Sequence, residues 1–285
     1  MTGSANSEPT RLKSASELMS GLTLGLSSDY IKDLGTEMRR CDKHKIDFKV
    51  SVKGMPWGSS LAVGSCPGCQ EDQSREEVAR LNQARLRIRK AKVERLGVPE
   101  GYANVSLSSY VTHTSSQSAA KQAVEELVSS PGGQVLVLSG SNGTGKTHLL
   151  CAGLLMADEG RYVTMMDVAV RIRSSYSANG NETEGDIFNG LIAKPLLAID
   201  EIDKARGSRA EHDWLTYLVS GREARLRPTI LATNRHFIAA CSQKGCESCL
   251  ESLLDRSIVS RITTAISIDG PDYRQANLNA KGGFE

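Results

Sequence analysis

The chain has 285 residues, of which 39% are hydrophobic and 5% aromatic, enough for one α/β domain of ordinary size and a smaller appendage. A formal net charge of +2 argues against wholesale binding of polyanions, so any contact with nucleic acid has to come from a local basic patch. No stretch has the apolar length of a membrane span and no secretory signal is visible, which predicts a cytoplasmic protein without a membrane partner.

The N-terminal part divides into a flexible start, residues 1–30, which is rich in Ser, Thr and Gly, and a candidate zinc module, residues 31–73. Seven cysteines in a chain without an export signal indicate metal ligands or free thiols rather than disulfides. In the module, a Cys-x-x-His pair and a Cys-x-x-Cys pair lie 21 residues apart, as tetrahedral Zn²⁺ requires. The predicted ligands are Cys41, His44, Cys66 and Cys69. The alternative is four unliganded surface residues.

A hairpin is predicted between the two pairs of ligands. Residues 46–52 alternate apolar and polar side chains like a strand, and Gly54, Pro56 and Gly58 then supply a turn. A knuckle, a hairpin and a second knuckle make a zinc-ribbon-like module. Because the segment has few apolar residues, metal would provide much of its stability.

Residues 74–97 are predicted to form a connecting helix, which Gly97-Val98-Pro99 ends. Apolar residues recur every three or four positions and make one narrow stripe: Val78, Leu81, Ala84 and Ile88. The other faces become basic, with Arg85, Arg87, Arg89, Lys90, Lys92 and Arg95. A basic face can bind phosphates or an acidic partner, or can simply be solvated, and both interpretations stay open. The stripe could dock onto another protein or onto the rest of this chain.

Residues 98–285 contain a phosphate-binding motif, because Gly140–Thr147 matches G-x-x-x-x-G-K-[ST]. A short apolar run, Val135–Ser139, precedes it as a strand, and an apolar stretch of helical length follows it. Loop N–H groups and the helix N-terminus would face the phosphates of ATP, Lys146 would reach the β- and γ-phosphates, and the Thr147 hydroxyl would help hold Mg²⁺. The predicted nucleotide-binding residues here are Gly140, Ser141, Asn142, Gly143, Thr144, Gly145, Lys146, Thr147 and His148.

Around this motif the sequence predicts helices at 119–129 and 167–176, a strand at 162–166 and a loop at 177–185. A later apolar strand ends in Asp200-Glu201, the Walker B pattern. Asp200 can bind Mg²⁺ through water and contribute to the nucleotide site, and Glu201 can act as the general base for the attacking water. Another strand is predicted at 229–234, and its last residue, Asn234, fits a sensor of the γ-phosphate.

The order of these motifs is that of AAA+ ATPases with an additional strand, in which a parallel sheet is flanked by helices. With the segments Leu254–Arg261 and Asp272-Tyr273-Arg274, the chain resembles DnaC/DnaI-type helicase loaders. The resemblance implies an ATPase that assembles into a ring or spiral and places a replicative, DnaB-like hexameric helicase on single-stranded DNA. The Cys/His pairs before the ATPase resemble the phage and prophage type of loader.

The resemblance also implies roles for three arginines. Arg261 is the first candidate for a finger that acts on the neighbouring subunit's nucleotide, and Arg256 is the second. They lie five positions apart, where four is commoner in the family. Arg274 matches a sensor that contacts the nucleotide of its own subunit. The alternative for each arginine is a surface ion pair.

One segment departs from the family pattern, between Asn234 and the arginine segment. It holds His236, Cys241, Cys246 and Cys249, which could form a second zinc site. Because the spacing of the first pair is irregular, free thiols in an insertion are the interpretation that the sequence favours.

Two further functions compete with helicase loading. An IstB-like transposition ATPase has the same core but acts with a transposase on duplex DNA. An adaptor would bind helicase and DNA and use ATP only as a switch. The Walker B glutamate and the arginines argue against the adaptor, and the zinc module favours the loader over the transposition ATPase.

Overall fold

The computed structural model describes residues 31–55, 58–130, 132–177, 182–204, 209–237, 241, 246, 249–254 and 256–273. The flexible start predicted for residues 1–30 and the predicted sensor Arg274 lie outside this part of the chain. The chain divides into two compact units, Met1–Arg85 and Leu86–Glu285. No helix in the described ranges is both long and apolar enough to cross a membrane.

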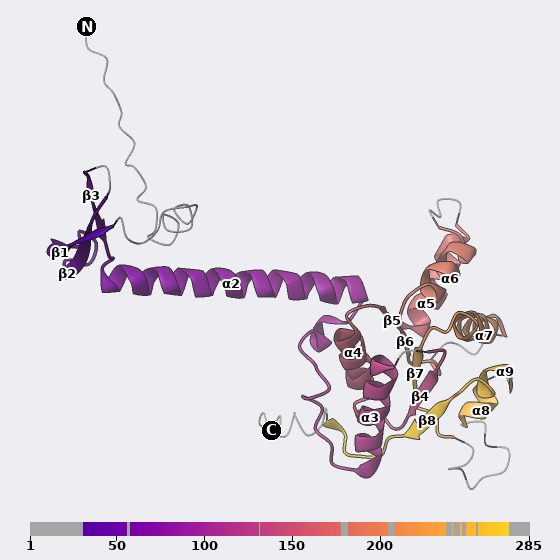
Figure 1. Ribbon diagram of the computed structural model, residues 1–285. Helices are drawn as coiled ribbons and strands as arrows, with labels where there is room; N and C mark the ends of the chain where they lie inside the picture. Colours follow the sequence, from indigo (N-terminus) through magenta and orange to yellow (C-terminus); the bar gives the residue numbers. More distant parts are fainter. Residues whose placement is uncertain are drawn as a thin grey trace, which may run out of the picture. The chain divides into compact units, whose positions relative to one another are not determined.

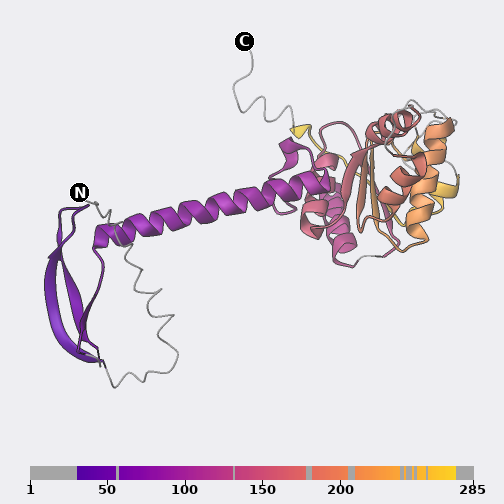
Figure 2. The ribbon, with the colours of Figure 1, turned by 90° about the horizontal axis from the view of Figure 1, so that it is seen from above.

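The first unit contains a three-stranded antiparallel sheet in the order β1-β2-β3 (Figures 1 and 2). Its strands are β1 (Lys32–Arg40), β2 (Asp47–Gly54) and β3 (Ser60–Val63). The predicted hairpin corresponds to β2 and β3, whereas β1 has no clear sequence signal because all nine of its residues are exposed. In the described part of this unit only Cys41, Val50, Val52 and Cys66 are buried, a core too small to hold a fold by apolar burial alone.

Helix α2 (Pro67–Leu96) begins seven residues before its predicted start at residue 74. Cys69 therefore lies in the first turn of this helix. Proline is well tolerated at the first position of a helix, since its missing N–H has no partner there in any case. The apolar stripe from Val78 to Ile88 is exposed. Only Val93 and Leu96, near the end of α2, are buried.

The second unit is built on a five-stranded parallel sheet in the order β5-β6-β7-β4-β8. The strands are β4 (Val135–Ser139), β5 (Arg161–Thr164), β6 (Leu197–Asp200), β7 (Thr229–Thr233) and β8 (Thr264–Ser267). Strand β7 lies between β4, which leads into the P-loop, and β6, which ends in Asp200. This is the additional-strand arrangement, so the predicted α/β fold class is confirmed.

Helices cover both faces of this sheet, as Figure 1 shows. One apolar core contains α3 (Ser115–Ser129) and α4 (Lys146–Ala157), and the other contains α5 (Met165–Ser175), α6 (Glu184–Ile192) and α7 (Arg209–Glu223). Successive strand residues alternate between the two cores: Leu136 and Leu138 enter the first, Val135 and Val137 the second. Three short helices complete the described elements: η2 (Glu100–Tyr102), α8 (Leu250–Leu253) and α9 (Arg256–Val259).

Helix starts account for the differences from the predicted elements in this unit. Thr114, Thr164 and Thr183 each cap a helix, and each forms a reciprocal capping box with the residue three positions on. Helix α3 therefore begins at Ser115, before its predicted start at residue 119. The strand predicted at 162–166 ends at Thr164, immediately before α5 begins. The loop predicted at 177–185 ends at Thr183, immediately before α6 begins. Helix α6 has no counterpart among the predicted elements.

Candidate nucleotide and metal sites

The P-loop connects β4 to α4 and is bent by glycine. Gly143 has φ +81°, and a Cβ atom there would lie 1.9 Å from Oδ1 of Asp272, so no larger residue fits without displacing the Asp272 side chain. The backbone N–H of Tyr273 donates to the carbonyl oxygen of Gly143 over 3.1 Å. Residues 272–273 are thus packed directly on the loop.

A cavity of about 460 Å³ opens beside the loop. Its lining brings together five of the predicted site residues from the P-loop, β6 and β7: Lys146, Thr147, Asp200, Glu201 and Asn234. Asn142, Gly143, Gly145 and His148, predicted to bind nucleotide, also line it. The parallel strands explain this convergence, because β4, β6 and β7 all end at the same edge of the sheet.

Asp200 is the centre of the polar contacts in this cavity. Its Oδ2 accepts hydrogen bonds from Thr147 Oγ1 at 2.7 Å and from the Tyr162 hydroxyl at 3.0 Å, and its Oδ1 accepts from the Glu201 N–H at 2.8 Å. Burial, and then the nearby Asp200 carboxylate, raise the pKa of Tyr162, which keeps this phenol a donor. A hydroxyl and a carboxylate held together in this way fit the oxygen ligands of Mg²⁺.

Lys146 is buried, and its ammonium group lies against the loop. Nζ donates to the carbonyl oxygens of Gly140 at 2.8 Å and of Ser141 at 2.7 Å. The charge is therefore already placed where the loop N–H groups and the N-terminus of α4 would favour phosphate.

Glu201 and Asn234 are held by residues that the sequence motifs did not indicate. Glu201 has φ +53°, an uncommon conformation for a residue with a side chain, and it forms an ion pair with Lys204. Asp203 Oδ1 accepts from the Asn234 N–H and from Thr233 Oγ1, both at 3.0 Å. These two contacts tie the turn after β6 to the end of β7.

Aromatic side chains form another wall that sequence reasoning missed. Tyr102, Tyr110 and Tyr273 line the cavity, and the Tyr110 hydroxyl donates to the Thr144 carbonyl oxygen at 2.9 Å. His148 packs edge to face on Tyr110 with ring centroids 5.3 Å apart, and burial lowers the pKa of His148, which favours the neutral ring. No local pattern connects these residues, which come from distant parts of the chain.

The two candidate finger arginines have different surroundings. Arg261 forms an ion pair with Glu223 Oε2, at the end of α7, over 2.7 Å and donates to the Ser257 carbonyl oxygen. Arg256, at the start of α9, is exposed and has no ion pair with any residue that the structure describes.

The first Cys/His cluster has the geometry of a metal site. The ligand atoms of Cys41, His44, Cys66 and Cys69 all lie within 4.8 Å of one another. His44 Nδ1 is 3.6, 3.7 and 3.4 Å from the sulfurs of Cys41, Cys66 and Cys69. Zn–S bonds of about 2.3 Å and Zn–N bonds of about 2.0 Å in a tetrahedron give edges of about 3.5–3.8 Å, so the donor set fits Zn²⁺.

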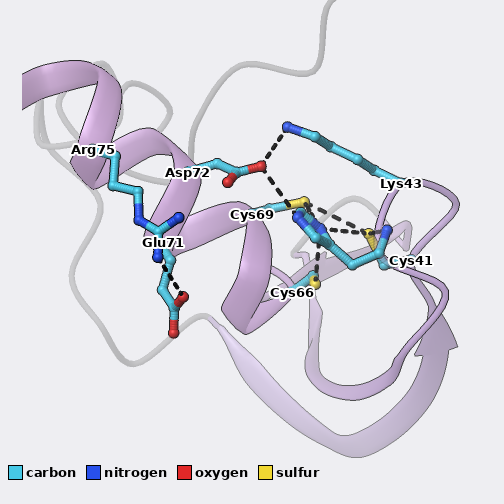
Figure 3. A network of polar contacts seen from close by, with 8 residues as sticks. Cys41, Lys43, Cys66, Cys69, Glu71, Asp72 and Arg75 are labelled. Atoms are coloured by element: carbon cyan, nitrogen blue, oxygen red, sulfur yellow. Dashed lines mark hydrogen bonds and ion pairs between the residues drawn. The ribbon is translucent and has the colours of Figure 1, made fainter. Parts of the chain in front are cut away.

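Asp72 supports this cluster from α2. Its Oδ2 is 3.1 Å from His44 Nε2 and also pairs with Lys43, and Figure 3 shows Asp72 between Lys43 and the cysteines. A carboxylate next to Nε2 favours the tautomer with the proton on Nε2, which leaves the lone pair of Nδ1 for a metal ion. The His44 backbone N–H donates to the Cys41 sulfur and is the main reason why the pKa of Cys41 falls to about 6, which favours the thiolate.

The second Cys/His group also comes together. The ligand atoms of His236, Cys241, Cys246 and Cys249 lie within 4.8 Å of one another. The spacing of these residues in the sequence favoured free thiols in an insertion, and the structure places all four side chains close enough together to share one metal ion.

Comparison with known proteins places this geometry in a family. Residues 88–280 match the family described as IstB-like ATP binding protein. The replicative helicase loader DnaC of Buchnera aphidicola subsp. Acyrthosiphon pisum (strain APS) is 28% identical over 214 residues, 71% of this chain and 81% of that protein. YdaV, an uncharacterized protein of Escherichia coli (strain K12), is 30% identical over 222 residues, 76% of this chain and 80% of that protein.

A solved structure of the replication initiator DnaA, bound to AMPPCP and single-stranded DNA, is similar with a TM-score of 0.51. It is 20% identical, and the match covers 66% of this chain and 57% of that chain, a likeness of fold. The family match covers more than half of the sequence and includes the P-loop, β6 and β7. The chain belongs to the IstB/DnaC-type family of AAA+ ATP-binding proteins.

Proposed function

We propose that this protein is an ATP-hydrolysing loader that places a replicative hexameric helicase on single-stranded DNA. The observation that carries the proposal is the convergence of Lys146, Thr147, Asp200, Glu201 and Asn234 on one cavity, in a chain similar to DnaC over 71% of its length. The chemistry of the cavity supports the first half of the proposal, ATP hydrolysis. The similarity to helicase loaders supports the second half, loading.

The arrangement of the cavity supports hydrolysis as well as binding. Lys146 and the P-loop N–H groups would hold the phosphates, and Thr147 and Asp200 would hold Mg²⁺, which shields the charge that develops on the phosphate oxygens. Glu201 lies next to Asp200 and would take the proton of the attacking water, while Asn234 would position that water. Glu201 lines the cavity and forms an ion pair with Lys204, which restrains the orientation of its side chain there.

The relatives support loading over the alternative. The family's description, IstB-like, fits a transposition ATPase that acts with a transposase on duplex DNA. The curated relative from Buchnera, matched over 81% of its length, is named as a replicative helicase loader. The N-terminal Cys/His module, for which we propose bound Zn²⁺, also favours the loader.

Basic residues of α2 are the candidates for contact with DNA phosphates. Lys92 and Arg95 already pair with Asp158 Oδ1 at 3.1 and 2.9 Å, and Arg89 donates to the Ala103 carbonyl oxygen. Arg85, Arg87 and Lys90 are exposed and have no ion pair among the described residues. Binding through these side chains would weaken as the salt concentration rises.

A helicase pull-down with the Glu201→Gln variant tests the proposal. The variant should bind ATP like the wild type but hydrolyse it about 100-fold or more slowly, because the general base is lost. With ATP it should therefore retain a hexameric replicative helicase that the wild type releases over time. Glu125→Gln, on the exposed face of α3, is the matched control and should behave like the wild type.

Two outcomes would contradict different halves of the proposal. Unchanged ATP turnover in Glu201→Gln would overturn the assigned mechanism of hydrolysis. No association with the helicase in any nucleotide state would overturn loading. Association with a transposase on duplex DNA in the same assay would favour the alternative function.

A further inference from the structure

The second Cys/His group lies inside the ATPase unit, in the segment that joins β7 to the arginine-bearing helix α9. His236 Nε2 is 3.3 Å from the sulfur of Cys249 and 3.7 Å from that of Cys246. Cys249 is buried with 1% of its surface exposed, and the other three residues are half-buried. All four donor atoms lie within 4.8 Å of one another.

These distances fit one metal ion better than four independent groups. A tetrahedral Zn²⁺ with sulfur and imidazole ligands has nitrogen–sulfur edges of about 3.5 Å and sulfur–sulfur edges of about 3.8 Å. Three cysteine sulfurs and one imidazole are soft and borderline donors, which favour Zn²⁺ over Mg²⁺ or Ca²⁺. Four protein ligands also leave no open position, which is the mark of a structural site rather than a catalytic one.

The packing around the group shows what such a metal would hold. His236 and Cys249 form an isolated parallel bridge, and the Leu250 N–H donates to the His236 carbonyl oxygen at 2.8 Å. Cys249 caps α8 without a side-chain hydrogen bond, and α8 itself is only four residues long. A helix of one turn is not stable by itself, so its position depends on its attachments.

The same segment is connected to the nucleotide cavity. His236 follows Asn234 by two residues, and the carbonyl oxygen of the intervening Arg235 accepts from Ser139 Oγ, at the end of the P-loop strand, over 2.6 Å. On the other side, Leu250 and Leu254 are buried in the apolar core that also contains Ile258 of α9. Movement of this junction would therefore reach both Asn234 and the arginine segment.

We propose that His236, Cys241, Cys246 and Cys249 form a second zinc centre, closed and structural, which fastens the end of β7 to the start of α8. This centre is additional to the N-terminal cluster and lies in the ATPase unit. The inference does not rest on helicase loading, because its test measures metal content and local opening.

The decisive test leaves the proposed centre untouched. The full chain and its Cys66→Ser/Cys69→Ser variant are purified under reducing conditions, and zinc per chain is measured by inductively coupled plasma mass spectrometry. We expect two zinc ions in the wild type and one in the variant, whereas no zinc in the variant would overturn the second centre. Cys151→Ala, which removes the buried cysteine outside both groups, is the control and should retain two.

The fastening role is tested by hydrogen exchange in a variant of the centre. Cys246→Ser should lose one zinc ion, and the amides of residues 234–237 and 250–254 should exchange about 10-fold or more faster, because a local opening becomes easier. Amides of β4 should be unchanged. Loss of zinc with unchanged exchange at these residues would overturn the fastening role.

Discussion

At the scale of single residues, the carboxylate of Asp72 supports the N-terminal Cys/His cluster without being one of its four predicted ligands. It lies 3.1 Å from His44 Nε2, and its ion pair with Lys43 lowers the pKa of Asp72, so it is a carboxylate at neutral pH. A charged acceptor on one ring nitrogen makes the other a better ligand and restrains the orientation of the ring. Gly68 adds to this restraint, because a Cβ atom there would lie 2.8 Å from the His44 ring.

Asp72→Ala should therefore weaken zinc binding by about 10- to 100-fold, the usual effect of losing such a partner. Competition with a chromophoric chelator measures the change in affinity. Glu71→Ala is the matched control, since the neighbouring Glu71 side chain is exposed and lies 3.8 Å from Arg75 rather than near the cysteines (Figure 3). Equal affinities for the two variants would rule out a supporting role for Asp72.

At the scale of elements, Arg222 joins α6, α7 and β7. It is fully buried in α7 and donates to the Leu191 and Lys194 carbonyl oxygens, at and just after the end of α6, at 2.9 and 2.8 Å. Its other donors reach Thr229 Oγ1 at 2.9 Å and the Pro228 carbonyl oxygen at 2.6 Å. The last carbonyl groups of a helix have no hydrogen-bond donors within the helix. A guanidinium group donates to them, and its positive charge is favourable at the negative end of the helix dipole.

Replacing Arg222 with methionine should lower the free energy of unfolding by about 3 kcal/mol or more, because several buried carbonyl groups lose a charged donor at once. Urea denaturation followed by circular dichroism measures this change. Arg225→Met provides the comparison: Arg225 lies just after the end of α7, is exposed, and donates to the carbonyl oxygen of Gly221 in that helix. Similar losses in the two variants would contradict the role given to Arg222.

At the scale of the whole molecule, the two candidate finger arginines, Arg256 and Arg261, differ in how firmly their own subunit holds them. Arg261 is held within its own subunit by Glu223 and the Ser257 carbonyl oxygen, and breaking these contacts would cost free energy. Arg256 is exposed at the start of α9, and in an assembly it would be available to a neighbouring subunit without that cost. We therefore propose Arg256 as the trans-acting finger and Arg261 as the residue that holds α9 against α7.

Subunit mixing tests this assignment. Arg256→Ala alone should bind ATP normally but lose most of its turnover in the assembled protein, since the loss of a finger costs about 10³-fold. Mixed with Glu201→Gln subunits, which keep the arginine but lack the base, it should regain part of its activity. Arg261→Ala should instead lower the thermal midpoint. Recovery by mixing for Arg261→Ala but not for Arg256→Ala would reverse the assignment.

Local motifs account for the parts of the fold and of the site that were predicted from the sequence. The P-loop at 140–147, the apolar strand before Asp200 and the strand that leads to Asn234 each depend on neighbours within about ten residues. The same holds for the Cys-x-x-His and Cys-x-x-Cys pairs of the candidate zinc module. The starts of α5 and α6 were not predicted, although Thr164 with Asp167 and Thr183 with Asp186 form capping boxes that are local sequence signals.

What the sequence by itself determined was the class of fold, the nucleotide-binding loop and the identity of the candidate ligands, because backbone geometry and short-range spacing encode them. The tertiary structure decided which distant residues meet: Asp72 with His44, Arg222 with the end of α6, the tyrosines with the P-loop, and His236 with Cys249. The physical reason is that these contacts depend on how strands, helices and loops pack, and this packing rather than sequence spacing brings such groups within hydrogen-bonding or ligand distance.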